Sequence, residues 1–382
     1  MIKRLIEDEV EAYIHRTDKK ILFIWGPRRS GKTTLLKKLK QVYAVPIFNF
    51  DLLSDRQKFV PDRDVLEKLV QEHKILLIDE VQNSPQSTVA LKILYDEFDV
   101  KVIATGSSEL RQKSAEEFDS LAGRFVETYC LPLSIDEIKN HDQPKEYEKA
   151  EYWQTLADTL QNFGCYPEVY DSALDEKEKI ELLENIVETY VLKDVIDIYN
   201  LKNVKLAHDI LVKIALQLGS EVSMREIANS LQANVQTVSN YIEIFIKNYI
   251  LIPLPSFKTN VRKSVSENRK LYFYDLGVRN ALVKDFRKLE LRPDSGGLWE
   301  NFIVCELEKM RRNHNIKKSL YFYREYGGRE VDIVIEDYHK KYLCLEIKKK
   351  KNKATSVFPI AHSLDVIHAN NYAAVIAGID QT

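Results

Sequence analysis

The segment Gly26–Thr33 constrains the fold of this chain more than any other part of its sequence. It reads Gly-Pro-Arg-Arg-Ser-Gly-Lys-Thr, which fits the pattern of a glycine, four residues, a second glycine, a lysine, and a serine or threonine. An apolar run, Ile21–Trp25, precedes it, and a stretch with helical spacing, residues 30–42, follows it. A strand, a glycine-rich loop and a helix in this order predict a loop that holds phosphate groups.

Each residue type in such a loop has a chemical task. Glycines let successive backbone N–H groups point at phosphate oxygens, a lysine neutralises the β- and γ-phosphates, and a hydroxyl binds Mg²⁺. We assign the last two tasks to Lys32 and Thr33, with Arg28 or Arg29 as a further phosphate clamp. The predicted nucleotide-binding residues are Gly26, Pro27, Arg28, Arg29, Ser30, Gly31, Lys32, Thr33 and Thr34.

Polar residues follow two further apolar runs. Asp79 and Glu80 come directly after Ile75–Ile78, and we expect Asp79 to hold the metal ion and Glu80 to activate the attacking water. The run Val100–Ala104 leads to Ser107, for which two interpretations remain open. It either senses the γ-phosphate or belongs to a simple turn.

Strands alternate with helices through the first 140 residues. Pro46–Phe50 completes a set of four apolar runs, and Val65–Glu72 has helical spacing. This alternation predicts an α/β fold with a parallel sheet. Arg124 is either an arginine finger offered to a neighbouring subunit or a surface arginine that caps a helix.

Charge is distributed unevenly along the 382 residues, whose formal net charge is only −2. Residues 1–135 hold 21 basic and 21 acidic side chains, residues 136–200 hold 6 and 17, and residues 201–382 hold 29 and 20. The net charges are therefore 0, −11 and +9. An acidic middle is a poor DNA surface, whereas a basic C-terminal half favours contact with nucleic acid.

Composition predicts a soluble protein of the cytoplasm. Apolar residues make up 45% and charged residues 30%, as in globular domains. No run reaches the ~18 consecutive apolar residues of a membrane span, and the charged N-terminus lacks the apolar core of a signal peptide. The four cysteines, Cys130, Cys165, Cys305 and Cys344, have no pairing or zinc-ligand spacing.

Residues 206–275 predict three helices followed by two short strands. Ser223 and Glu226 have the spacing of a capping box, and the apolar stripes of the last two helices predict a helix-turn-helix. A hairpin over Leu254–Tyr274 would form a basic wing, whose cations are Lys258, Arg262, Lys263, Arg269 and Lys270. The second helix carries no arginine on its outward face, so non-specific DNA contact and a protein-interaction module both remain open.

A second set of carboxylates lies near the C-terminus. We expect a helix near residues 298–311 and strands at 320–324, 330–335, 342–348 and 372–377. If the middle strands pair, Asp332 meets Glu346 and Lys348 at one edge of the sheet. Two carboxylates would hold Mg²⁺ there and the lysine would stabilise charge at a phosphodiester, with Glu300 as a third carboxylate. An acid and a lysine two apart on a strand are also common without any such role.

The ordered motifs together resemble a known family. They are Gly26–Leu35, Leu77–Gln82, Thr105–Ser108, Ser120–Arg124, Leu131–Ser134, Gly164–Glu168, Tyr272–Arg279, Gly297–Asn301, Glu330–Asp332 and Glu346–Lys348. The chain resembles, over nearly its whole length, a bacterial and archaeal family of AAA+-type ATPases. In that family the C-terminal region is classified as a domain of unknown function.

The pattern of predicted elements divides the chain into four domains with boundaries near residues 140, 205 and 275, and the resemblance implies the identity of the first, third and fourth. They are an ATPase core of the P-loop NTPase type over 1–140 and a helical lid or linker over 141–205, then a winged helix over 206–275 and a PD-(D/E)XK nuclease-like domain, of the restriction-endonuclease-like α/β fold, over 276–382. By position it implies ATP and Mg²⁺ at Lys32, Thr33, Asp79 and Glu80. It likewise implies a nuclease pattern at Glu300, Asp332, Glu346 and Lys348.

Two hypotheses from different classes follow. The first is an ATPase that acts on DNA through the wing at 256–270 and the lysine-rich segment 346–353, with a Mg²⁺-dependent nuclease site and possible assembly into a homo-oligomer. The second is a nucleotide-controlled switch that binds protein or DNA and cuts nothing, with its sheet-edge carboxylates as remnants of an ancestral fold.

Overall fold

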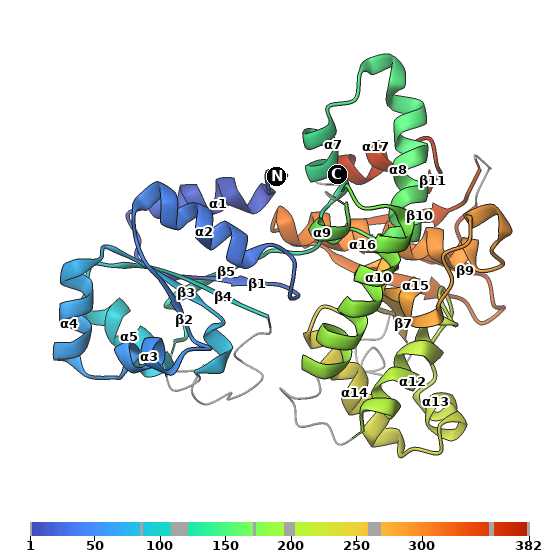
Figure 1. Ribbon diagram of the computed structural model, residues 1–382. Helices are drawn as coiled ribbons and strands as arrows, with labels where there is room; N and C mark the ends of the chain where they lie inside the picture. The colour runs from blue at the N-terminus through green and yellow to red at the C-terminus, as the bar shows by residue number, and fades with distance from the viewer. Residues whose placement is uncertain are drawn as a thin grey trace. The chain divides into compact units, whose positions relative to one another are not determined.

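The computed structural model describes residues 2–84, 87–107, 121–170, 173–194, 203–258, 269–350 and 355–379. Backbone contacts divide the chain into two compact units, residues 1–133 and 134–382 (Figure 1). The wing residues 259–268, with Arg262 and Lys263, and the end of the lysine-rich segment, residues 351–353, lie outside the described residues.

The first unit is built on a five-stranded parallel sheet. Its strands are β1 (Ile21–Trp25), β2 (Ile47–Asn49), β3 (Ile75–Asp79), β4 (Lys101–Gly106) and β5 (Phe125–Tyr129), in the order β2-β3-β4-β1-β5. The α/β fold with a parallel sheet is therefore confirmed. The strand β5 was not predicted, although its run Phe-Val-Glu-Thr-Tyr consists mainly of aromatic and β-branched residues, which favour strands.

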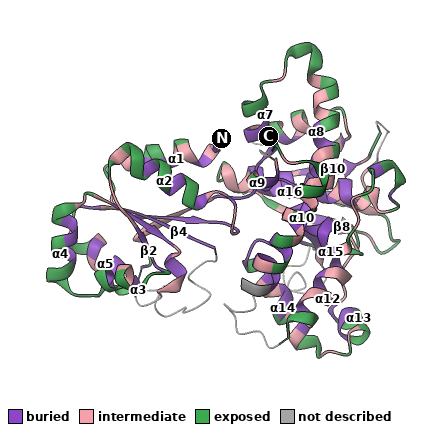
Figure 2. Ribbon diagram, viewed as in Figure 1, coloured by how far each residue is buried: buried purple, intermediate pink, exposed green. Residues whose placement is uncertain are grey.

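Helices cover both faces of this sheet (Figure 1). They are α1 (Leu5–His15), α2 (Lys32–Tyr43), α3 (Leu53–Arg56), α4 (Arg63–Glu72) and α5 (Ser87–Glu97), with short 3-10 turns η1 (Gln57–Phe59) and η2 (Val81–Asn83). Val10 of α1 and Leu36 of α2 pack with Leu22 and Ile24 of β1 in one apolar cluster. All five residues of β1 are buried, and Figure 2 shows burial over most of the neighbouring strand β4. Burial on both faces explains why these strands are continuous apolar runs.

The second unit is mainly helical in its first half and contains further helices up to its C-terminus. They are α7 (Ile135–Asp142), η4 (Glu146–Glu148), α8 (Lys149–Phe163), α9 (Pro167–Tyr170), α10 (Glu176–Ile186), the π-helical η5 (Val187–Asp194), α12 (Val204–Ala215), α13 (Met224–Ser230), α14 (Val235–Lys247), α15 (Leu276–Val283), η7 (Leu289–Leu291), α16 (Ser295–Asn313) and α17 (Tyr372–Gly378). None of the helices in the described parts of the chain combines the length and apolar character needed to cross a membrane.

Two sheets complete the second unit. The strands β6 (Leu251–Pro255) and β7 (Arg269–Phe273) form an antiparallel pair. The strands β8 (Ser319–Arg324), β9 (Glu330–Glu336), β10 (Tyr342–Ile347) and β11 (Ser363–Ile367) form a mixed sheet in the order β11-β10-β9-β8. In it β11 runs parallel to β10, and the other neighbours are antiparallel.

One apolar core joins the helical segment to the predicted helix-turn-helix. It contains Leu183 of α10, Ile210 of α12, Ile227 of α13, Phe245 of α14 and Phe273 of β7. The helices α12, α13 and α14 and the pair β6–β7 occupy the residues predicted for them. The local signals that define them lie in the sequence, because Ser223 accepts a hydrogen bond from the Glu226 N–H at 3.3 Å and so caps α13.

Residues 256–257, which directly follow β6, pack against the C-terminal sheet. The Phe257 N–H donates to the Phe322 carbonyl of β8 at 2.7 Å. The Phe257 ring lies 4.9 Å from the Phe358 ring, in a cluster with Val331 and Cys344. The first arm of the hairpin is therefore anchored to the sheet that carries the second carboxylate set.

The strand predicted at 372–377 is wrong, because these residues form the helix α17. Tyr372 and Ile376 are buried, and their spacing of four places them on one helical face. Three alanines in this short segment further favour a helix. The fourth strand of the sheet is β11 instead, whose polar residues Ser363 and Asp365 alternate with Leu364 and Val366.

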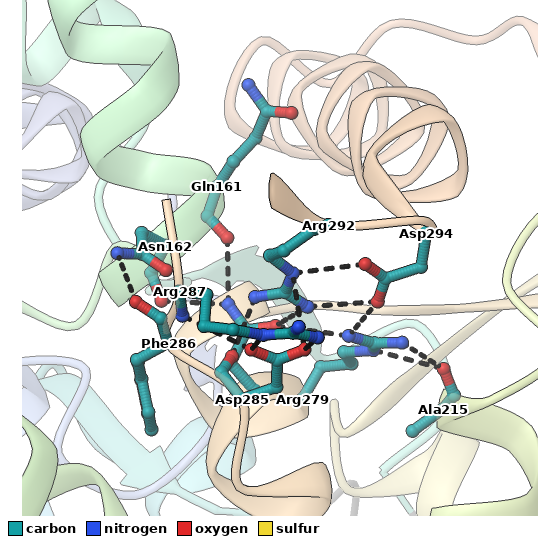
Figure 3. Close-up of polar contacts among 10 residues, drawn as sticks. Gln161, Asn162, Ala215, Arg279, Asp285, Phe286, Arg287, Arg292 and Asp294 are labelled. Atoms are coloured by element: carbon teal, nitrogen blue, oxygen red, sulfur yellow. Dashed lines mark hydrogen bonds and ion pairs between the residues drawn. The ribbon is translucent and has the colours of Figure 1, made fainter. Parts of the chain in front are cut away.

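A cluster of buried arginines ties several helices of the second unit together (Figure 3). Arg279 of α15 donates to the Ala215 carbonyl of α12 and lies 2.6 Å from an Asp294 oxygen. Arg292 donates to both oxygens of Asp294 and to the side chain of Asn280. Asn280 in turn donates to carbonyls at the end of α8. These contacts hold together α8, α12, α15 and the start of α16, the helix that carries Glu300.

Candidate functional site

The predicted phosphate loop connects the end of β1 to the start of α2. Gly31 has φ +105°, a conformation that favours glycine, and a Cβ on Gly26 would lie 1.9 Å from the Cys130 carbonyl oxygen. Both glycines are therefore required by the backbone. Ser30 is fully buried and closes the loop by donating from Oγ to the Pro27 carbonyl at 2.8 Å.

Lys32 is buried beneath this loop, with 4% of its surface exposed. Its Nζ donates to the carbonyl oxygens of Gly26 at 2.8 Å and Pro27 at 2.6 Å. Burial lowers the pKa of Lys32, because the charged form loses its hydration. The hydrogen bonds of the lysine therefore go to neutral carbonyl groups, while the nearby charges of Glu80 and Asp79 partly offset the effect of burial.

Asp79 lies at the end of β3 and is 6% exposed. It accepts a hydrogen bond from Thr33 Oγ1 at 2.8 Å and from Thr105 Oγ1 at 2.5 Å. The structure therefore brings together Thr33 and Asp79, the two residues predicted to hold the metal ion. Thr105 lies on the predicted strand end, but its partnership with Asp79 was missed.

Glu80 and Ser107 are linked through Gln82, a residue that the sequence analysis did not select. The Gln82 Nε2 donates to a Glu80 carboxylate oxygen and, at 3.0 Å, to Ser107 Oγ. Glu80 has φ +54°, which is uncommon for a residue with a side chain and occurs often at functional sites. Gln82 is the last residue of the motif Leu77–Gln82, but that motif assigned it no role.

The other residues predicted to bind the nucleotide differ in how far they are exposed to solvent. Arg28 and Arg29 are half-buried, Arg29 has φ +62°, and Thr34 is exposed on α2. Arg4, which no motif indicated, is 8% exposed and donates to the carbonyls of Ser30 and Leu131. Arg4 therefore connects the phosphate loop to the residue that follows Cys130 and stabilises the position of the loop.

Arg124 lies at the opposite edge of the sheet from the loop. Its carbonyl accepts from the N–H of Ile21, the first residue of β1, whereas the loop follows the last residue of β1. Five residues of strand separate the two edges by roughly 16 Å. Its guanidinium donates to both Asp96 oxygens, at 2.8 and 3.2 Å. Arg124 therefore does not serve the loop of its own chain, and a role in a neighbouring subunit stays a prediction.

The second carboxylate set lies on β9 and β10. Ile333 pairs with Leu345, which brings Asp332 and Glu346 next to each other in register. The Ile347 N–H donates to Asp332 at 2.6 Å, and Lys348 Nζ lies 3.0 Å from Glu346 and 4.0 Å from Asp332. The predicted meeting of Asp332, Glu346 and Lys348 is thus present in the structure.

Burial gives this set unusual electrostatics. Burial, with the nearby charges of Glu300 and Glu346, raises the pKa of Asp332 to about 6. The Oε1 atom of Glu346 is buried and accepts no hydrogen bond within the described part of the chain. Such an oxygen is a potential ligand for a cation.

Glu300 does not complete a three-carboxylate metal site with Asp332 and Glu346. Its Oε1 accepts from Lys270 Nζ at 2.9 Å and from the Tyr272 hydroxyl at 2.5 Å. Across the described residues, no group of three or more His, Cys, Asp or Glu side chains is placed to hold a metal ion. The sequence pattern could not locate the buried lysine that binds this carboxylate, and the role of Glu300 as a third carboxylate stays a prediction.

Two of the five cations assigned to a DNA-binding wing are bound within the protein. Arg269 lies 2.7 Å from Glu243 of α14, and Lys270 is 1% exposed. Lys348 of the lysine-rich segment is bound to Glu346, while Lys349 and Lys350 are exposed. The basic surface available to a partner among the described residues is thus smaller than the sequence indicated.

Comparisons with known families match three successive parts of the chain. Residues 18–139 match an AAA domain, residues 154–290 match a domain of unknown function (DUF8612), and residues 295–379 match another (DUF4143). The chain therefore contains an AAA domain followed by a DUF4143 domain.

Similar proteins extend over most of the chain. An uncharacterized protein of Methanocaldococcus jannaschii is 28% identical over 368 residues, which cover 91% of this chain and 79% of the relative. One of Haemophilus influenzae is 25% identical and covers 78% of this chain and 76% of its own.

Solved structures are more distant. The RuvB Holliday junction branch migration motor of Thermotoga maritima is 16% identical, covers 66% of this chain and 90% of its own, and has a TM-score of 0.32. A signal transduction ATPase (STAND) protein of Pyrococcus horikoshii is 14% identical, covers 81% of this chain and 45% of its own, and has a TM-score of 0.30. Similarities this low support no inference about this chain.

Proposed function

We propose that the first unit binds ATP and hydrolyses it with the help of Mg²⁺. The observation that carries this proposal is the hydrogen bond between Thr33 and Asp79, at 2.8 Å. It joins α2, the helix that follows the phosphate loop, to the end of the acidic strand β3. These are the two elements that hold nucleotide phosphates and their metal ion in P-loop enzymes.

The residues at this point fit a magnesium ion. A threonine hydroxyl and an aspartate carboxylate are both oxygen ligands, which Mg²⁺ prefers. When bound, the ion would neutralise charge on the phosphate oxygens. Thr105, which donates to the other Asp79 oxygen, orients the carboxylate.

Lys32 would bind the phosphates by exchanging its hydrogen-bond partners. Its present partners are the carbonyl oxygens of Gly26 and Pro27, which are neutral. A phosphate oxygen is a charged acceptor, and hydrogen bonds between charged groups are roughly twice as strong as neutral ones. The buried position of Lys32 strengthens the attraction further, because little water screens it.

Glu80 would accept a proton from the attacking water. Gln82 donates to its carboxylate and fixes its direction, while Ser107 accepts from the same amide group. This chain of contacts gives Ser107 a route to report the γ-phosphate to Glu80. It favours the sensor interpretation of Ser107 over that of a simple turn.

The test is phosphate release from ATP by the full chain with Mg²⁺. Lys32→Ala should reduce the rate at least about 100-fold, because it removes the phosphate-binding charge. Lys37→Ala is the matched control, since Lys37 is exposed on the same helix. Equal rates for the parent and Lys32→Ala would refute the proposal.

A second candidate function is hydrolysis of DNA phosphodiesters in the second unit. The buried Glu346 Oε1, which accepts no hydrogen bond in the described part of the chain, supports it. With Asp332, this carboxylate would hold one divalent cation, and Lys348 would stabilise charge on the phosphate. The exposed Lys349 and Lys350 next to it would contact the DNA backbone.

This second candidate has a separate test. DNA is incubated with the full chain and Mg²⁺ or Mn²⁺, with and without ATP, and examined for cleavage. Asp332→Ala should abolish cutting while leaving ATP hydrolysis unchanged. A chain that hydrolyses ATP and binds DNA but never cuts it would favour the nucleotide-controlled switch instead.

A further inference from the structure

A buried lysine lies among the carboxylates of the second unit. Lys270 belongs to β7 and has only 1% of its side chain exposed. Its Nζ donates to Glu300 of α16 at 2.9 Å and to Glu330 of β9, and it lies 5.4 Å from the centre of the Phe322 ring. One ammonium group thus links two acidic residues from two elements.

The partners of Lys270 are themselves held in place. The Tyr272 hydroxyl donates to the same Glu300 oxygen as Lys270 does. The other oxygen of Glu330 accepts from Arg324 Nε at 2.8 Å, and Arg324 also lies 2.8 Å from Glu221. Both carboxylates therefore have fixed positions and charged partners.

The charges of the whole cluster nearly balance. Its members are Glu221, Lys270, Glu300, Arg324, Glu330, Asp332, Glu346 and Lys348. Five carboxylates and three cations leave a net charge of −2 when all are ionised. Without Lys270 the net charge would be −3, and Glu300 would lose its cation.

We propose that Lys270 is an internal cation that takes the place of a metal ion between Glu300 and Glu330. The reason is geometric and electrostatic. Two carboxylates that share one small cation form the arrangement that a divalent metal would otherwise bridge. An ammonium group of the chain fills that position and keeps the two acids from repelling each other.

Two consequences follow for the cluster. Glu300 is then not available to a divalent cation, and within the described cluster Asp332 and Glu346 are the carboxylates that bind neither Lys270 nor Arg324. Lys270 also connects the β6–β7 pair to α16 and β9. The proposal does not depend on hydrolysis of ATP or of DNA, since it concerns cation binding alone.

The test replaces Lys270 in the full chain and measures thermal unfolding with and without Mn²⁺. Lys270→Met has a similar length but no charge, so it leaves Glu300 and Glu330 without a cation. We expect its Tm to fall by several degrees. About 1 mM Mn²⁺ should restore at least about half of that loss, because the freed carboxylates bind the metal.

Two controls make the result specific. Sodium chloride at the same ionic strength should restore little, and Lys270→Arg should respond to Mn²⁺ no more than the parent does. The triple variant Lys270→Met, Glu300→Gln, Glu330→Gln removes the carboxylates together with the cation. Its Tm should lie above that of Lys270→Met and should no longer respond to Mn²⁺ more than the parent does.

The opposite results would overturn the proposal. They are a Lys270→Met protein whose Tm responds to Mn²⁺ no more than that of the parent, or a triple variant that still gains stability from Mn²⁺. If Lys270→Met does not fold alone but folds when Mn²⁺ is present during purification, the proposal is supported. If it fails to fold with and without Mn²⁺ while the triple variant folds, the metal-replacement role is refuted.

Discussion

Two sets of buried charges, one in each unit of this chain, differ in the partners of their closest contacts. In the first unit, Lys32 bonds to two backbone carbonyls and Asp79 to two threonine hydroxyls. In the second unit, Lys309 lies 2.7 Å from Glu306, and Arg279 lies 2.6 Å from Asp294. The first set has neutral partners and the second set has charged ones.

Whether a buried charge has neutral or charged partners indicates whether it belongs to a binding site or stabilises the fold. A buried charge that has only neutral partners still gains much from an ion of opposite charge, such as a phosphate group or a metal ion. A buried charge that already faces its counter-ion gains little, and removing either partner leaves the other uncompensated. We therefore expect substitutions in the first unit to change activity and those in the second unit to change stability.

The largest effect is expected for Arg279→Met in the second unit. The substitution keeps the length of the side chain but leaves Asp294 with one guanidinium partner instead of two and frees the Ala215 carbonyl (Figure 3). Breaking a buried ion pair costs about 3–5 kcal/mol of stability, which urea unfolding would measure. Arg287→Met is the control, because Arg287 is 59% exposed and bonds only locally to Asp285. Similar stabilities for the two variants would contradict the structural role of the cluster.

The next effect is expected for Asp79→Asn in the first unit. The amide keeps the shape of the carboxylate, so the fold should persist, but it lacks the charge for a metal ion. We expect kcat for ATP hydrolysis to fall by about 100-fold, with a change in Tm of no more than a few degrees. Steady-state phosphate release and thermal unfolding would measure the two quantities. A large loss of stability with unchanged kcat would reverse the assignment.

A smaller effect of opposite sign is expected for Asp332→Asn. The pKa of Asp332 is raised to about 6 from an ordinary value of 3.8, so the folded protein favours the protonated acid. The stability associated with this acid is fully present below pH ~4 and is lost as the pH rises through about 6. Asparagine resembles the protonated form and should stabilise the protein by about 2 kcal/mol at pH 8.

The same variant should show almost no difference from the parent at pH 4. Urea unfolding at the two pH values measures the change, and Asp365→Asn on the exposed edge strand β11 is the control. A variant that is less stable than the parent at pH 8 would indicate that the charged carboxylate itself stabilises the fold.

The smallest effect is expected for Gln82→Ala. Its amide joins Glu80 to Ser107, so its loss should misdirect the carboxylate without weakening nucleotide binding. We expect kcat to fall by about 10-fold and KM to remain unchanged, as steady-state kinetics would measure. An unchanged kcat would show that Gln82 does not orient Glu80 for catalysis. A raised KM would indicate a role in nucleotide binding instead.

Much of the fold could be predicted because local patterns carry it. The strands β1, β3 and β4 are buried on both faces, so they appear as continuous apolar runs. The half-exposed β5 and the alternating β11 give weaker signals and were missed. The segment Tyr372–Gly378 was assigned to a strand because a short apolar run has no clear period.

The residues of the candidate site also fall into those that a local pattern predicted and those that only tertiary packing places. The spacing between the loop and the acidic strand predicted that Thr33 and Asp79 meet, because parallel strands present their ends at one edge. Arg4 has no motif, since its contact with the loop depends on packing from a distant part of the chain. Lys270 was assigned to DNA because the sequence gives its charge but not its burial.

If the first unit hydrolyses ATP, its buried carboxylate Asp79 is needed for turnover, whereas the buried carboxylate Asp332 of the second unit is not. The most direct test applies one substitution, aspartate to asparagine, to Asp79 and to Asp332 in the full chain. Phosphate release from ATP with Mg²⁺ is measured for both variants beside the parent. The account predicts that Asp79→Asn loses nearly all turnover and that Asp332→Asn retains that of the parent. Equal turnover in the two variants would contradict it.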